Sequence, residues 1–573
     1  MKFRTFIIPL AVAAGLVLVL GVGLLGGLAL RTPLYLLDRG GQAVPQAVQF
    51  IPKQSVWAAS VLARPDRLAQ LWDYLANPQQ RPALRLDRER LERAILAQTA
   101  LTYERDLLPW LGEEITVALV TADLDQDPTN GRTPGYLAAL SCRDLAKAQA
   151  TLELFWQNRA LAGSPLTFED VGGTRLIYSR PVPPPSTTAG PAVADLMPLA
   201  TALVANRMLL VANDPMVLRQ ALSAAQATGD NLKTDWRYKL ALKTLSTPRV
   251  GLLALNLPQL EGWLHPTAPG DSPIARSVDP PALDWGLISF ALQRQGVLAE
   301  AAWIASPGHH LTAHQLPLSE RDTLAHYLPG SLTLEAVGQT LTELGQQLQP
   351  WVQPWGGREG ATTFLAQAVD PRWGPGTSRQ MVDRVNQTYA LGLDLQPLSA
   401  ASNWILASPA QPSVQPWIET LGQQAQAQGL GLGQLEILGH PTTVWTRLSL
   451  GSGRPGALQV QTEVTGLSAT VGADQVLTTA PELMEQALAV DQARAAQPPW
   501  TALIPVFPQA GESYVHLNWP SLEAYLRQQV PQFRLWEAVA KPALKHLETL
   551  TLTSYGQTEQ VHHAGLFIQL QNT

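Results

Sequence analysis

The stretch LNLPQLE at Leu255–Glu261 returns as LNWPSLE at Leu517–Glu523, at an offset of 262 residues. In both places an apolar stretch ends at asparagine and a helical pattern follows. Asparagine accepts a hydrogen bond at the start of a helix, and proline suits the first turn, where its missing N–H costs little. Each stretch therefore predicts a strand that passes directly into a capped helix.

Two further matches keep the same order along the chain. Pro215 with QAL at 220–222 matches Pro481 with QAL at 486–488, at an offset of 266, and FIP at 50–52 matches YLP at 327–329, at an offset of 277. Matches in one order with slowly drifting offsets indicate a tandem duplication. We place the first copy at residues 45–308, the second at 322–573, and a connector at 309–321.

Within the first copy, short apolar strands alternate with helical patterns and tight turns. The strands expected at 166–171 and 175–179 meet at Gly172-Gly173, which is a hairpin signal. Asp214-Pro215 opens a helix as a cap followed by proline. Strands joined by hairpins, with helices between them, predict an α+β unit whose sheet is mixed and mainly antiparallel.

The N-terminal segment Phe6–Leu30 contains no charged side chain. Roughly 25 residues at 1.5 Å each span about 37 Å as a helix, more than a hydrocarbon core of about 30 Å. Lys2 and Arg4 place the tip, residues 1–5, in the cytoplasm and the rest of the chain in the periplasm or a lumen. Cleavage after Ala29, as in a signal peptide, is the alternative. The expected fold is thus a single transmembrane helix followed by two tandem α+β units.

The composition is apolar and weakly charged, with 46% hydrophobic residues, 15% charged residues and a net charge of −6. Enough apolar surface is present for folded domains, so wholesale disorder is excluded. No concentrated basic face is visible, which disfavours nucleic acid as a partner. The single cysteine, Cys142, cannot form an intrachain disulfide, and its place at the end of an expected strand favours a small buried residue over a reactive thiol.

The run DLLPWLG at Asp106–Gly112 follows LTYER at Leu101–Arg105. Together with the opening at Val61–Leu68 and the helix expected after Asp144, it resembles the bacterial family called domain of unknown function 3352, in the style of its cyanobacterial members. The signature positions are Asp106, Pro109, Trp110 and Gly112. The second copy departs from the pattern around Met381–Tyr389. The resemblance implies the fold and the anchored layout, and no reaction or site.

Three aspartates give the best metal candidate in the sequence. Asp123, Asp125 and Asp127 alternate along the chain, and alternate carboxylates can converge on Ca²⁺. Pro128 and Pro134 stand where a calcium loop has glycine and glutamate. We therefore favour a solvated loop over a weak calcium site.

Two other motifs are weaker. His310 and His314 stand four residues apart in the connector, with His309 adjacent, so two imidazoles would share one face of a helix. Zinc needs a third protein ligand, and no HExxH glutamate lies between the two histidines. We therefore interpret them as exposed linker histidines. The run GSGRPG at 451–456 spells GxGxxG, but it joins two expected strands instead of preceding a helix, so it predicts a hairpin turn. The sequence therefore predicts no catalytic residue and no cofactor.

Three functions remain as hypotheses. The first is a non-enzymatic, membrane-anchored interaction or assembly module outside the cytoplasm, with the lipid bilayer and other membrane or periplasmic proteins as partners. The second is a carrier or sensor of an apolar, lipid-like ligand between the two repeats, suggested by the 17 tryptophans. The third is an unrecognised metal-dependent hydrolase that uses the Asp123 loop or the histidines near His309.

Overall fold

The computed structural model describes most of the chain after residue 40. The described residues are 40–75, 101–127, 130–179, 198–204, 207–264, 282–314, 317–318, 324–352, 360–395, 402–410, 414–452, 458–489, 497–529 and 546–571, with the single positions Leu36, Leu37, Pro82, Leu86, Glu89, Phe533 and Leu544. The tip at 1–5 and the predicted membrane segment Phe6–Leu30 lie outside them. Within the described part, no helix is both long enough and apolar enough to cross a bilayer.

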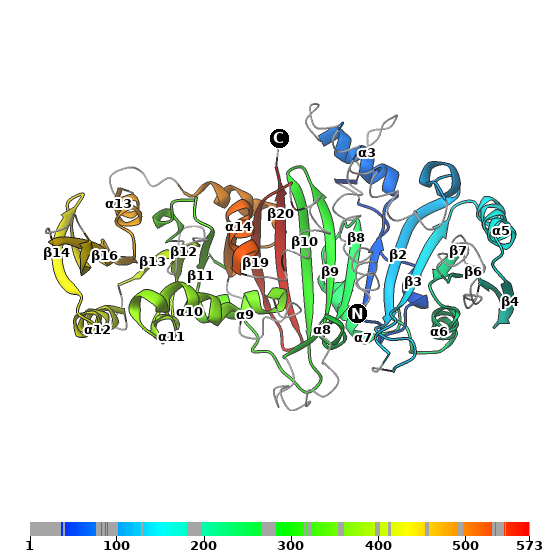
Figure 1. The fold of residues 1–573 in the computed structure, drawn as a ribbon, viewed down its shortest axis with the longest axis horizontal. Coiled ribbons are helices and arrows are strands. Elements are labelled where there is room, and N and C mark those ends of the chain that lie inside the picture. Colours follow the sequence, from blue (N-terminus) through cyan, green and yellow to red (C-terminus); the bar gives the residue numbers. More distant parts are fainter. Residues whose placement is uncertain are drawn as a thin grey trace. The chain divides into compact units, whose positions relative to one another are not determined.

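Contacts divide the chain into two compact units. Unit 1 comprises residues 1–311, 536–546 and 571–573, and unit 2 comprises residues 312–535 and 547–570. Each unit contains ten strands among its described residues, and every strand pair within a unit is antiparallel. The predicted α+β class with a mainly antiparallel sheet is therefore confirmed (Figure 1).

The strands of unit 1 are hydrogen-bonded in the order β4-β5-β6-β7-β3-β2-β1-β8-β9-β10. Their bounds are β1 Trp57–Val61, β2 Leu111–Thr121, β3 Gly135–Cys142, β4 Leu166–Val171, β5 Thr174–Ser179, β6 Ala200–Val204, β7 Met208–Ala212, β8 Gly251–Asn256, β9 Leu283–Gln293 and β10 Gly296–Ala305. The helices and helical turns are η1 Ala47–Phe50, α3 Pro65–Leu75, η2 Tyr103–Leu107, α5 Leu145–Leu161, α6 Pro215–Gln226, α7 Trp236–Thr244 and α8 Leu257–Leu264. Helix α6 packs against β3, β5, β6 and β7.

Unit 2 has the same order, β14-β15-β16-β17-β13-β12-β11-β18-β19-β20. Its strands are β11 Leu334–Gly338, β12 Tyr389–Asp394, β13 Asn403–Pro409, β14 Gly431–Ile437, β15 His440–Ser452, β16 Leu458–Val471, β17 Asp474–Thr478, β18 Ser513–Asn518, β19 Leu547–Gln557 and β20 Val561–Leu570. The helices and turns are η5 Leu324–Tyr327, α9 Leu341–Val352, α10 Gly360–Trp373, α11 Thr377–Arg384, α12 Val414–Ala427, α13 Pro481–Ala489, η7 Pro499–Val506 and α14 Trp519–Gln529. Each strand of unit 1 thus has a counterpart in unit 2.

The central strand pairs of the two units have the same register. In unit 1, Trp57 of β1 pairs with Leu255 of β8, and in unit 2, Leu334 of β11 pairs with Leu517 of β18. Trp57 and Leu334 are 277 residues apart in the chain, and Leu255 and Leu517 are 262 residues apart. The sequence matches show the same offsets at these places. The two units therefore share both their strand order and their registers.

The asparagines of the repeated stretch cap equivalent helices. Asn256 Oδ1 accepts the amide of Gln259 at 3.3 Å, and Asn518 Oδ1 accepts the amide of Ser521 at 3.2 Å. Each asparagine also donates its own amide at 3.0 Å to the residue before the first strand of its unit. The predicted strand-to-helix caps are thus present in both units.

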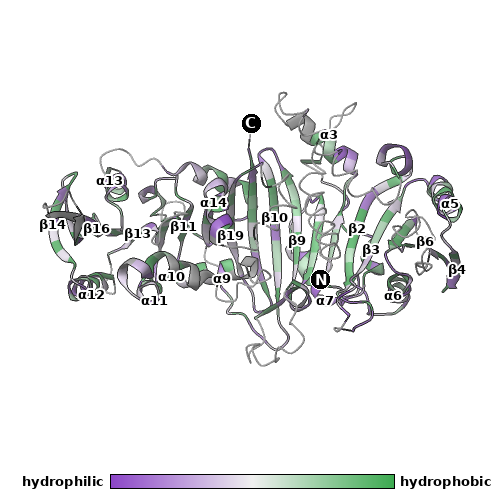
Figure 2. Cartoon of the chain, viewed as in Figure 1, coloured by the Kyte–Doolittle hydropathy of each residue, from purple (hydrophilic) through white to green (hydrophobic). Residues whose placement is uncertain are grey.

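Several strands are buried on both faces of the sheet. In unit 1, β1 and β10 are buried along their whole length, and Figure 2 shows the strands β2, β3 and β9 mostly white to green, while the helices carry purple faces. In unit 2, a cluster of large side chains joins helices α9 to α12 to the strands; it includes Trp373, Trp404, Trp417 and Trp445. Apolar burial of this extent is the main favourable term in folding.

Candidate functional site

The signature residues form a corner between η2 and β2. Trp110 is buried, and its indole N–H donates to the carbonyl of Asp106 at 2.6 Å. The Asp106 carboxylate accepts the amide of Thr102 at 2.7 Å and pairs with Arg105 at 2.9 Å. The hydrogen bond from the Arg105 guanidinium holds the pKa of Asp106 below its ordinary value. These polar groups are occupied by contacts within the corner itself.

Arg143, which follows β3, closes the corner from the other side. Its guanidinium donates to the carbonyls of Leu108 at 2.9 Å and Pro109 at 3.2 Å. A Cβ at Gly112 would collide with the Ser141 hydroxyl of the neighbouring strand, so only glycine allows this approach. The signature positions therefore hold β2 against β3, a packing role, and nothing in this geometry points to a ligand.

A buried carboxylate lies next to this corner. Glu114 in β2 is fully buried, while its neighbour Glu113 is exposed. Its two oxygens accept the amides of Gln46 at 2.7 Å and Ala47 at 2.8 Å, which start η1. The Thr116 hydroxyl donates a third bond at 3.1 Å. Burial raises the pKa of Glu114, and these donors oppose that effect. The carboxylate is an internal cap for a helical turn.

The acidic loop uses its carboxylates for its own turns. Asp125 accepts the Asn130 side-chain amide at 2.7 Å and the Asp127 backbone amide at 3.2 Å, and these bonds lower the pKa of Asp125. Asp123 accepts the Thr133 amide at 3.0 Å. Among the residues that the structure describes, no group of three or more His, Cys, Asp or Glu side chains could hold a metal ion. The solvated loop therefore stays the favoured interpretation, with Asp123, Asp125 and Asp127 as weak metal candidates.

The structure assembles a polar chain that the sequence does not suggest. His314 Nδ1 is 2.9 Å from Glu512 Oε1, and the Ser554 hydroxyl lies 3.3 Å from both Glu512 Oε2 and His562 Nε2. Burial lowers the pKa of His562 to about 4, so the ring is neutral at pH 7. Ser554 is itself buried. A serine beside a histidine there has the elements of a nucleophile pair, but it is enclosed by strands β19 and β20.

His314 also fixes the connector to unit 2 through the backbone. Its amide and carbonyl exchange hydrogen bonds of 3.0 and 2.9 Å with Gln557 at the end of β19. Of the other predicted histidines, His309 donates its amide to the Ser306 carbonyl. The interpretation of His314 as an exposed linker residue is therefore wrong, because a bridge to Gln557 and a bond to Glu512 hold it against the sheet. Sequence spacing gives no sign of partners almost 200 residues away.

The glycine-rich run begins at the end of strand β15. Gly451 and Ser452 end β15, which pairs in antiparallel fashion with β16, and residues 453–457 are outside the described part. A dinucleotide site needs a helix N-terminus after the run. Here the run is followed by strand β16, which pairs with β15, so the prediction of a hairpin is confirmed.

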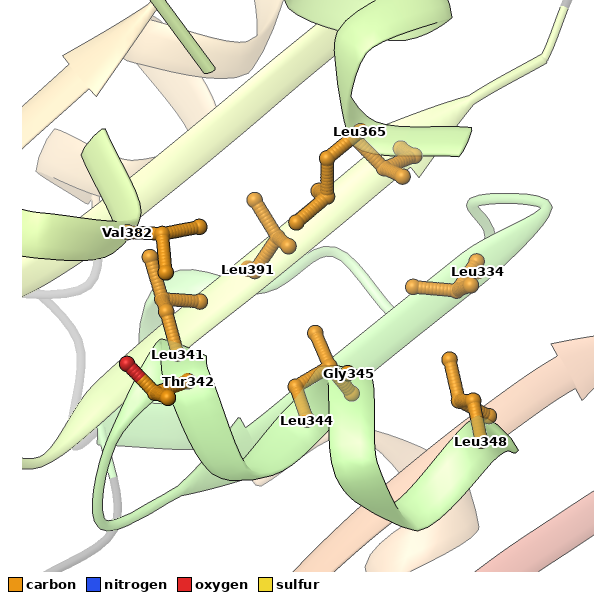
Figure 3. Close-up of a pocket in the computed structure, with 10 residues that line it drawn as sticks. Leu334, Leu341, Thr342, Leu344, Gly345, Leu348, Leu365, Val382 and Leu391 are labelled. Carbon is orange, nitrogen blue, oxygen red and sulfur yellow. The ribbon is translucent and has the colours of Figure 1, made fainter. Parts of the chain in front are cut away.

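Unit 2 contains an apolar cavity of about 80 Å³ between its helices and its sheet. The lining comes from α9, α10 and α11 and from strands β11 and β12: Leu334, Leu341, Thr342, Leu344, Gly345, Leu348, Leu365, Val382, Leu391 and Leu393. Figure 3 shows the aliphatic side chains converging on one space, with the Thr342 hydroxyl as the oxygen drawn among them. At about 24 cal/mol per Å³, such a space leaves about 2 kcal/mol of packing energy unrealised.

Strand β14 forms a free edge of unit 2. In the described part of the chain it is hydrogen-bonded to β15 alone, and every residue from Gly431 to Glu436 is exposed. Leu432 and Leu435 are 51% and 56% exposed, and Leu438 in the following turn is 45% exposed. The strand contains one charge, Glu436, and neither lysine nor proline, the residues that usually protect an edge.

Comparison with known proteins gives a family and little else. No curated protein matches the chain. A solved structure titled "Structure of crystal form I of TP0453" is similar at 9% identity over 48% of this chain and 88% of that chain, with a TM-score of 0.25, which supports no argument about fold or function. A family model described as "Protein of unknown function (DUF3352)" matches residues 11–570. The chain, with its signature corner and its two copies of one unit, therefore belongs to the DUF3352 family.

Proposed function

We propose that this chain is a membrane-anchored, non-enzymatic assembly module, built from two copies of one unit, whose molecules associate through the free edge of β14. The single observation that carries the proposal is the exposed, apolar and nearly uncharged edge of that strand. An edge strand offers unpaired backbone N–H and C=O groups, which another strand can satisfy.

The equivalent strand of unit 1 provides an internal comparison. Glu169 of β4 pairs with a residue of β5 that pairs in turn with Ala202 of β6. Leu435 of β14 is connected in the same way, through β15, to Ala469 of β16. Glu169 and Leu435 therefore occupy equivalent positions in the two units. Glu169 forms an ion pair with Arg219 at 2.7 Å, and Asp170 follows it. The edge of unit 1 is thus charged, whereas the same edge of unit 2 carries leucine. The edge of unit 2 therefore lacks a charge at the position of Glu169, while the acid at the next position, Asp170 in β4 and Glu436 in β14, is common to both edges.

The occupant that fits β14 best is β14 of a second copy. In an antiparallel pair centred on Leu435, that leucine faces itself and Gln434 faces Glu436 of the second copy, where the amide can donate to the carboxylate. Leu432 then lies beside Leu438 of the second copy. All three exposed leucines gain an apolar neighbour, and a two-fold pair of this kind closes without forming a fibre.

The membrane anchor strengthens this proposal. We place Phe6–Leu30 across a bilayer, with residues 1–5 in the cytoplasm and the chain after residue 30 in the periplasm or a lumen, on the basis of the uncharged length of the segment and of Lys2 and Arg4. Anchored molecules are confined to a surface, so their effective concentration is high and a small interface is sufficient. Extraction of membranes with alkaline carbonate tests the anchor: the chain should stay in the pellet, and its release would refute this placement.

Cysteine crosslinking of the full-length chain in native membranes tests the pairing. Leu435→Cys should give a disulfide dimer under mild oxidation, since residues directly opposite in an antiparallel pair have Cβ atoms about 5 Å apart. Gly433→Cys should give little, because the two copies of that position are displaced by about 13 Å along the strands. Native Cys142 is buried and provides the background.

The matched control is Phe168→Cys on β4, which is 53% exposed on the charged edge. Leu435→Lys should convert the detergent-solubilised dimer to monomer in sedimentation, since like charges directly opposite are unfavourable, whereas Phe168→Lys should not. A monomeric wild-type chain, or equal crosslinking at 435 and 168, would refute self-association through β14.

A further inference from the structure

We infer that the apolar cavity of unit 2 binds the end of a single unbranched hydrocarbon chain. Nine of its ten lining residues have no polar side-chain atom, and Thr342 is the exception. A buried water needs two to four polar partners, so such a space stays dry unless an apolar group enters it. The inference does not depend on the proposed association through β14.

The size of the cavity decides the class of ligand. Its volume is about 80 Å³. Sites for whole drug-sized molecules measure about 300–1,000 Å³, and a benzene-binding engineered cavity about 150 Å³. The space is therefore too small for a ring or a whole lipid, and it suits the narrow end of an alkyl or acyl chain. The cavity lies inside unit 2, so it is distinct from the expected site for a lipid-like ligand between the two repeats.

The ligand would enter on the side of α9 and α11. The floor of the cavity is buried, with Leu391 and Leu393 of β12 fully inaccessible. Around the entrance, Thr342 is exposed, while Gly345, Leu348 and Val382 are half-buried. With no charged residue in the lining, the site recognises the chain, and the polar head of the ligand stays in solvent.

Gly345 is the second observation that favours an opening. It lies inside α9, where glycine is less favourable than alanine because its backbone is more flexible in the unfolded chain. A residue with a side chain at this place in the wall would narrow the entrance. Gly345 lines the cavity and is half-buried, so we place it at the entrance.

Two probes with one chain and different heads test this inference. Decanoic acid and decanol should bind the full-length chain with similar affinity, measured by calorimetry in a detergent without a straight alkyl chain. Gly345→Leu and Val382→Phe, which fill the entrance from α9 and α11, should each weaken binding at least tenfold. Leu348→Ala, which widens it, should keep or improve binding.

The matched control is Gly262→Leu in α8 of unit 1, where an added Cβ meets nothing within 4 Å. It should leave the affinity unchanged. Vesicles of a diacyl phosphatidylcholine, added in place of the free amphiphile, separate the two sources: protection of the same entrance residues would assign a membrane acyl chain, and binding of the free probes alone would assign a soluble amphiphile.

Equal binding by wild type and Gly345→Leu, or no binding of either probe, would overturn the inference and leave a dry packing void. The dimer crosslink at position 435 is measured on the same variants. Because it reports on β14 and not on the cavity, loss of probe binding with an intact crosslink separates this inference from the proposed function.

Discussion

Replacement of the buried Glu114 by glutamine tests the structural reasoning at the point where it is most specific. Glu114 Oε2 accepts the amide of Gln46 and Oε1 that of Ala47, so each oxygen serves a different N–H group. Glu114→Gln keeps the shape of the side chain but replaces one oxygen with an NH₂ group. One of the two backbone amides then faces a donor and loses its partner.

The expected cost follows from these contacts. A buried N–H group without an acceptor costs about 1–3 kcal/mol. Part of this is offset, because burial raises the pKa of Glu114 and the substitution removes a desolvated charge. We expect a net loss of about 2 kcal/mol, which for a unit of this size lowers Tm by about 4–8 °C. The control is Glu113→Gln, exposed on the same strand, with an effect below about 0.5 kcal/mol.

Thermal unfolding followed by tryptophan fluorescence measures this difference, and hydrogen exchange at the amides of Gln46 and Ala47 locates it. The sign of the pH dependence is also determined. Since the native state binds the Glu114 proton more tightly than the unfolded state does, the carboxyl contributes more stability as the pH falls toward the ordinary value of 4.5. The advantage of wild type over Glu114→Gln should grow in that direction. Equal stability of Glu114→Gln and Glu113→Gln would refute the capping role.

Three further predictions concern the caps, the thiol and a buried histidine. Asn256→Ala and Asn518→Ala should each destabilise their unit by about 1 kcal/mol in urea unfolding, because equivalent caps are lost. Cys142, whose pKa burial raises to about 11, should resist iodoacetamide at pH 8 in the native chain and react in urea, as read by mass spectrometry. His562 has a pKa lowered to about 4, so the unfolding free energy of unit 2 should fall as the pH decreases from about 6.5 to 4, and His562→Gln should reduce that slope.

Local features of the fold were accessible from the sequence because they depend on neighbouring residues. The Asn-Pro stretches at 256 and 518 predicted capped helices after strands, and the structure has both. Gly172-Gly173 predicted a hairpin, and β4 and β5 meet there. The helix expected at 144–159 is α5, capped by Asp144, whose carboxylate accepts the Lys147 amide at 3.1 Å. In each case, the preferences of a few consecutive residues decide the conformation.

The sites depended on contacts that no local pattern contains. No pattern near Glu114 shows that Gln46 and Ala47, almost 70 residues earlier, supply the donors to its carboxylate. The same holds for the chain from His314 through Glu512 to His562, and for a cavity lined by three helices and two strands. The signature Trp110 was visible as a motif, but its bond to Asp106 and the bonds from Arg143 to Leu108 and Pro109 were not.

By itself, the sequence determined the class of the fold, the repeated unit and its offsets, because hydrophobic periodicity and turn residues act over short distances along the chain. Tertiary structure alone decided which polar groups are buried together, which edge strand is left unprotected and where packing is incomplete. Those properties arise when strands far apart in the sequence are brought into register, so they depend on the assembled sheet as a whole and not on any segment of it.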